Sequence, residues 1–98
     1  MARQLASLRA VEAVEAQIDE RRIVGFDGRV LEVFGGETRR FHGQLCSLRL
    51  PPPDKKGITH AVIVQSGREW PLDMEADALD RFQVVLAALR AAGVRVTE

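Results

Sequence analysis

Apolar residues recur every three or four positions near the start of the chain and predict a helix over residues 3–20. Good helix formers are abundant in this segment, and it contains no glycine or proline. The apolar residues that share one face of the predicted helix are Leu5, Leu8, Val11, Val14 and Ile18. This stripe is thin, and thin stripes suit contact between helices. We therefore expect an N-terminal amphipathic helix within residues 1–21, with this stripe as an interface to a partner or to the chain's own sheet.

From residue 22 the helical period stops, and short β-rich runs alternate with turn residues. The pairs Asp27-Gly28 and Gly35-Gly36 accept positive φ, as two-residue hairpin loops require. Connections this short join only antiparallel neighbours. The pattern therefore predicts a meander of five or six antiparallel strands, with a proline-rich exposed loop at residues 51–57. The expected strands cover residues 22–26, 29–34, 37–42, 45–50, 60–65 and 68–72.

A second helical pattern covers residues 74–92. Asp73 is the expected N-cap and Gly93 the expected stop. The apolar stripe of this helix, which should pack on the sheet, consists of Leu79, Phe82, Leu86 and Leu89. Residues 94–98 are expected to form a frayed tail.

Together these elements predict an α+β fold, in which a small antiparallel meander curls into a partial barrel that the C-terminal helix caps. The runs IVGFDGRVLEVFGG, ETRRFH, LCSLRL, HAVIVQSGREWPL and ALDRFQVVLAALRAA follow one another in the stretch from residue 23 to residue 92. In pattern and element order this stretch resembles the pleckstrin-homology-like (PH-like) barrels of bacteria. The resemblance implies one domain over residues 22–98 and a binding module for phosphoinositides, peptides or its own copies, without common catalytic residues. That family has seven strands, one more than we count, and the leading helix is an addition to it.

Composition narrows the class of protein. The chain has 98 residues, 46% of them apolar, and its 14 Lys+Arg balance 14 Asp+Glu. These values exclude a disordered chain, and a single cysteine cannot close a disulfide within the chain. No apolar run approaches the ~20 residues of a membrane span or the length of a signal peptide, so we expect a cytoplasmic protein without a membrane span.

Residues able to carry catalysis or bind a metal are few. Cys46, His42 and His60 are the only cysteine and histidines, and no glycine-rich elbow or helix start accompanies the cysteine. Asp77 and Asp80 lie at the start of the second helix, where carboxylates act as capping charges. We therefore predict no catalytic residue, no metal site and no cofactor. The neutral charge, the terminal helices and the inward-facing aromatics also argue against a nucleic-acid-binding barrel.

Charge is segregated along the chain. Residues 21–56 contain eight basic and four acidic side chains, a net charge of +4. One interpretation is an anion-facing patch at a loop end of the barrel, made of Arg39, Arg40, Lys55 and Lys56. The other is an ordinary solvated surface with protective charges on an edge strand, and adjacent strand residues such as Arg39 and Arg40 point to opposite faces.

Two functional hypotheses follow. The first is a non-catalytic binding or oligomerisation module that meets a protein partner or its own copy through the N-terminal helix or a sheet edge. The alternative is a domain that binds an anionic lipid or a phospho-ligand with the four basic residues.

Overall fold

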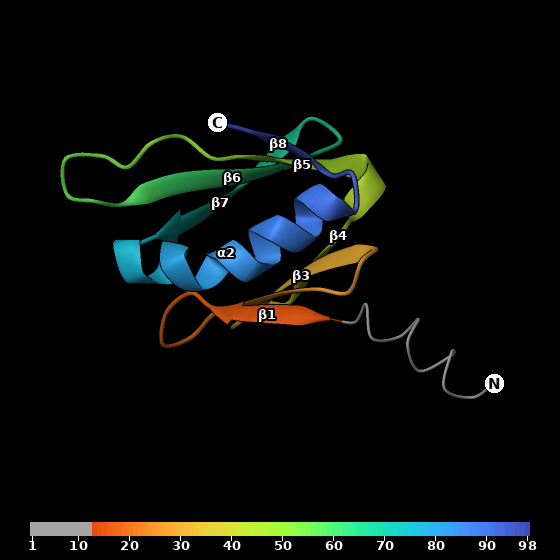
Figure 1. Cartoon of the computed structure of the whole chain (residues 1–98). Coiled ribbons are helices and arrows are strands. Elements are labelled where there is room, and N and C mark those ends of the chain that lie inside the picture. The colour runs from red at the N-terminus through yellow and green to blue at the C-terminus, as the bar shows by residue number, and fades with distance from the viewer. Residues whose placement is uncertain (1–12) are drawn as a thin grey trace.

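The computed structural model describes residues 13–98, which form two four-stranded sheets and one helix (Figure 1). The first sheet is an antiparallel meander in which each strand pairs with the next. Its strands, in spatial order, are β1 (Val14–Gln17), β2 (Ile23–Phe26), β3 (Val30–Phe34) and β4 (Arg39–His42).

A short 3₁₀ helix, η1 (Gly43–Leu45), leads into the second sheet. After β7 the chain forms α2 (Ala76–Ala91) and returns to this sheet as β8. The spatial order is β7-β6-β5-β8, and only the pair of β5 and β8 is parallel. The strands of the second sheet are β5 (Cys46–Arg49), β6 (Thr59–Gln65), β7 (Arg68–Met74) and β8 (Arg95–Thr97).

The predicted N-terminal helix is wrong over residues 14–17, which form β1. Val14 pairs with Phe26 and Gln17 with Ile23, so the strand belongs to the first sheet. Side chains alternate between the two faces of a strand, and Ala16 and Ile18 accordingly face the core while Glu15 and Gln17 are exposed. The expected domain boundary after residue 21 thus falls in the turn between two paired strands. Residues 1–12, including Leu5, Leu8 and Val11, lie outside the described residues.

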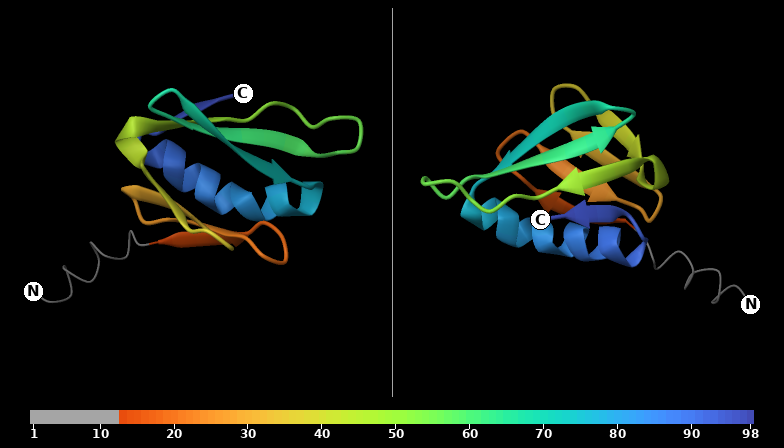
Figure 2. Two further views of the ribbon diagram at one scale, coloured as in Figure 1. Left: turned by 180° about the vertical axis from the view of Figure 1, so that it is seen from behind. Right: turned by 90° about the horizontal axis from the view of Figure 1, so that it is seen from above.

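The predicted C-terminal helix is present, and its apolar stripe faces the sheets. Phe82, Leu86 and Leu89 are buried, and α2 packs against strands of both sheets, as Figure 2 shows from two sides. The expected cap was wrong, because Asp73 belongs to β7 and Glu75 precedes the helix without a side-chain capping bond. Asp73 instead accepts a hydrogen bond from His60 on the neighbouring strand.

The prediction of a frayed tail over residues 94–98 was also wrong. After Gly93, with φ at +84°, Val94 donates its N–H to the Leu89 carbonyl at 3.0 Å and is buried. Arg95–Thr97 then pair with Ser47–Arg49 of β5. The buried Val94 side chain and this pairing hold the tail against the second sheet.

The two sheets do not close into a barrel. Helix α2 packs mainly against β1 and β2 and also contacts β7 and β8, whereas β4 and β7 are the edge strands opposite β1 and β8 in their sheets. Between the sheets lies one core, to which Phe26, Leu31 and Ile63 contribute. No helix in the part of the chain that the structure describes is long and apolar enough to cross a bilayer.

Candidate functional site

A cleft opens between the two sheets, beside the edge strands β4 and β7. Its volume is about 370 Å³, near the lower end of the ~300–1,000 Å³ that is typical of ligand pockets. Its apolar lining comes from both sheets and consists of Val33, Phe41, Ile63, Trp70 and Pro71. We call this space the inter-sheet cleft.

The apolar wall of the cleft is held together by an aromatic pair. The rings of Phe41 on β4 and Trp70 on β7 meet edge to face, with centroids 5.0 Å apart. Phe41 is buried, whereas Trp70 is half-buried and borders the cleft. Edge-to-face pairs are favourable, so this contact joins the two sheets while leaving part of the indole available to a ligand.

Two guanidinium groups stand at the rim. Arg22 bonds the Asp19 carboxylate at 2.9 Å and the Asp73 carbonyl at 3.2 Å, which fixes its position between the sheets. Arg39 lies on β4, on the same inward face as Phe41, and bonds the Glu37 carboxylate at 3.0 Å. Glu37 is 81% exposed, and exposed ion pairs contribute only ~0–1 kcal/mol. Another anion could therefore replace Glu37 as the partner of the Arg39 guanidinium at a small cost in free energy.

A glycine shapes one end of the cleft. Gly35 has φ at +137°, and a Cβ built on it would lie 2.2 Å from the Arg21 carbonyl oxygen. The turn between β3 and β4 can approach Arg21 and Arg22 this closely only because residue 35 has no side chain. This approach brings the Glu37–Arg39 pair and Arg22 to the same cleft.

The hydrogen bonds next to β4 show which of its backbone groups face the free edge. Gly43 donates its N–H to the Arg29 carbonyl on the β3 side at 2.7 Å, whereas His42 donates to Oε1 of Gln65 on β6 at 3.2 Å. Because these groups alternate along a strand, the N–H and C=O of Arg40 point away from β3. Within residues 13–98 no strand pairs with this edge.

The structure does not bring the four predicted basic ligands together. Arg39 lines the cleft, whereas Arg40 lies on the other face of β4 and bonds Glu32. Lys55 and Lys56 are exposed in the loop between β5 and β6 of the other sheet, which projects away from the helix in Figure 1. The lining of the cleft includes neither lysine.

Two residues of the predicted docking stripe contribute to the chain's own fold instead. Ile18 is 4% exposed, and the half-buried Val14 packs against the core. Neither is available as an exposed docking surface. The alternation of side chains along a strand already indicated that Arg39 and Arg40 lie on opposite faces of β4. The position of Trp70 on the opposite wall of the cleft could not be predicted, because contacts between sheets leave no local pattern in the sequence.

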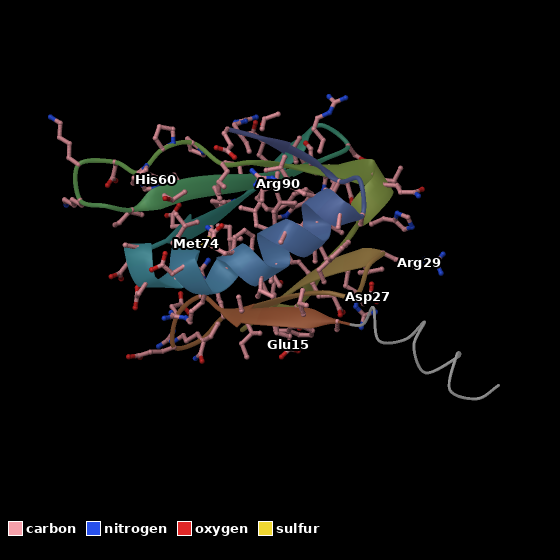
Figure 3. The ribbon with its side chains drawn as sticks, in the orientation of Figure 1. Glu15, Asp27, Arg29, His60, Met74 and Arg90 are labelled. Atoms are coloured by element: carbon pink, nitrogen blue, oxygen red, sulfur yellow. The ribbon has the colours of Figure 1, made fainter. Side chains whose placement is uncertain are left out.

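The cysteine and histidines lie apart from the cleft. Cys46 is buried, and burial raises the pKa of its thiol, which contacts the Gly43 carbonyl at 3.9 Å. His42 accepts a hydrogen bond from the Gln44 N–H, and His60 bonds Asp54 and Asp73 (Figure 3 labels His60). Among residues 13–98 no group of three or more His, Cys, Asp or Glu side chains is placed to hold a metal ion.

Comparisons with known proteins give no relative. A scan against protein-family models, a search of curated proteins and a search of solved structures each produced no match for this chain.

Proposed function

We propose that this chain is a non-catalytic binding module with a PH-like architecture, and that it takes an extended segment of another polypeptide on the free edge of β4. The observation that carries the proposal is the position of that edge. Its unpaired backbone groups lie beside the inter-sheet cleft, where the half-buried Val33 and Trp70 border the surface.

The element order supports a PH-like architecture. The sequence suggested six strands, and β1 supplies a seventh within a four-stranded and a three-stranded antiparallel group that a helix follows. Seven strands and a terminal helix are what the resemblance implies. The parallel strand β8 is an addition to that plan.

Strand addition suits this surface because it uses two kinds of contact. Main-chain hydrogen bonds to a sheet edge supply affinity, and pockets for alternate side chains supply specificity. The N–H and C=O of Arg40 offer the first, and the cleft beside Phe41 and Trp70 offers the second.

The charges on β4 bear on the identity of the partner. Symmetric pairing of two β4 edges would bring Arg39 and Arg40 of both copies together, and like charges across paired strands are destabilising. If the chain self-associates, we therefore expect a different segment of the second copy on this edge. A segment of another protein, in the cytoplasm, satisfies the same geometry.

The environments of the reactive side chains support a non-catalytic role. Burial disfavours the thiolate of Cys46, and the thiolate is the nucleophilic form. The two ring nitrogens of His60 both bond carboxylates. The separation of Arg39 and Arg40 from Lys55 and Lys56 likewise favours a polypeptide over the alternative of an anionic lipid.

An edge proline tests the proposal. Arg40→Pro removes one outward N–H but no bond to β3, and proline is tolerated on edge strands. Arg40→Ala is the matched control, because it removes the same side chain and keeps the N–H. We expect the native chain and Arg40→Ala to bind N-acetylated extended hexapeptides, with Arg40→Pro up to about tenfold weaker because it loses one backbone hydrogen bond.

The readout is the emission of Trp70, the single tryptophan, with sedimentation velocity run in parallel for self-association. Equal binding or equal self-association by Arg40→Pro and Arg40→Ala would contradict the proposal. A native chain that stays monomeric and binds none of the peptides would also contradict it.

A further inference from the structure

We infer that the segment received by the inter-sheet cleft is a polypeptide C-terminus, whose last apolar side chain enters the cleft and whose α-carboxylate bonds Arg39. This inference rests on the proposed function and names the partner's chemistry.

The apolar part of the cleft suits a single side chain rather than a long apolar segment. The whole cleft has a volume of about 370 Å³. Phe41 and Ile63 at its base are buried, so its apolar contact surface comes mainly from the half-buried Val33 and Trp70. The half-buried Trp70 can cover an aliphatic side chain that enters from the edge of β4. Filling the cleft with such a side chain would remove apolar surface of both partners from water.

The rim supplies the complement of a carboxylate. Arg22 is fixed by Asp19 and the Asp73 carbonyl, so it contributes a stationary positive group. Arg39 is about half exposed and is bonded to the highly exposed Glu37. A carboxylate delivered by a docked strand can replace Glu37, because guanidinium groups bind carboxylates through short, charge-assisted hydrogen bonds.

The length of the free edge favours a chain end over a continuous strand. Along β4, the next outward N–H after Arg40 is that of His42, and it already bonds Gln65 of the second sheet. A strand added to this edge therefore loses its backbone partners where the sheets converge. At its other end β4 begins at Arg39, directly after the turn from β3. A chain that runs antiparallel to β4 and ends beside Arg39 needs no further backbone partner, and the two arginines select a carboxylate end over an ammonium end.

Paired peptides test this inference with the whole chain. The probe is an N-acetylated hexapeptide of alternating threonine and valine that ends in leucine, made as the free acid and as the C-terminal amide. Trp70 emission reports binding. We expect the amide to bind about tenfold more weakly, since it lacks the charge-assisted bond to Arg39.

Variants of two similar ion pairs provide the control. Arg39–Glu37 and Arg49–Glu69 both measure 3.0 Å, and their arginines are 49% and 51% exposed. Arg49 lies on β5, on the outer face of the second sheet, and does not line the cleft. Arg39→Gln should reduce binding of the free acid to the level of the amide, whereas Arg49→Gln should bind both peptides as the native chain does. Thermal unfolding followed by circular dichroism checks that both variants fold.

Three results would overturn the inference. Equal binding of acid and amide by the native chain would show that the carboxylate is not recognised, while leaving strand addition intact. Hexanoate binding as tightly as the peptide would make the cleft a site for small acids. If neither peptide binds, and none of the other N-acetylated extended hexapeptides binds, the proposed function is contradicted as well.

Discussion

His60 ties the long loop between β5 and β6 to the second sheet through both ring nitrogens. Nδ1 lies 2.9 Å from Oδ1 of Asp73, its partner across β6 and β7, and Nε2 lies 2.8 Å from Oδ2 of Asp54 in the loop. The other oxygen of Asp54 accepts the N–H groups of Lys56 and Ile58. Ionised carboxylates only accept hydrogen bonds, so both contacts require the protonated imidazole.

The stability of the chain should therefore depend on His60 in the pH range that begins near the ordinary histidine pKa of about 6.5 and extends above it. The bonds to Asp54 and then Asp73 raise the pKa of His60 above its ordinary value. A raised pKa stabilises the fold fully below the unfolded value, and this contribution is lost as pH rises through the folded value. We expect the unfolding midpoint to fall modestly across this range, and His60→Gln to flatten the change. If the unfolding midpoints of the native chain and of His60→Gln change equally with pH, this role of His60 is contradicted.

At the scale of elements, β1 shows how tertiary pairing overrides local preference. The segment is rich in residues that favour helices, yet Val14, Ala16 and Ile18 also alternate with Glu15 and Gln17. Both periods fit this short stretch. Pairing with β2 and packing under α2 select the strand, because most helical stability in proteins comes from packing rather than propensity.

The variant Ile18→Ala tests whether Ile18 belongs to the core beside β1 and not to an exposed docking helix. Ile18 is 4% exposed, so its truncation should lower the free energy of unfolding by about 2–5 kcal/mol. Ile23→Ala is the matched control, because Ile23 on β2 is 38% exposed and its truncation should change stability much less. Chemical denaturation compares the two. If Ile18 instead belonged to a docking surface, its truncation would leave monomer stability unchanged and reduce association.

At the scale of the whole molecule, α2 joins the two sheets into one unit. It packs against β1 and β2 of the first sheet and against β7 and β8 of the second. Phe82 is fully buried in the common core. The two sheets should therefore unfold together, in one transition, as small single domains usually do.

Phe82→Ala should lower the free energy of unfolding by about 3–5 kcal/mol. This is a large part of the ~5–15 kcal/mol of stability that is expected for a domain of this size. Val84→Ala on the same helix is the control, because Val84 is 48% exposed. Circular dichroism and Trp70 emission should report coincident denaturation curves for the native chain and the control. Separate transitions for the two probes would show that the sheets are independent units.

The sequence by itself determined the elements whose pattern is local. Glycine turns placed six strands correctly, and the period of Phe82, Leu86 and Leu89 placed the helix and its buried face. Only the tertiary structure decided the state of residues 14–17, the pairing of the tail with β5, and the placement of Arg39 and Trp70 around the same cleft. Each of these depends on contacts between segments far apart in the chain, and such contacts leave no periodic signal in either partner.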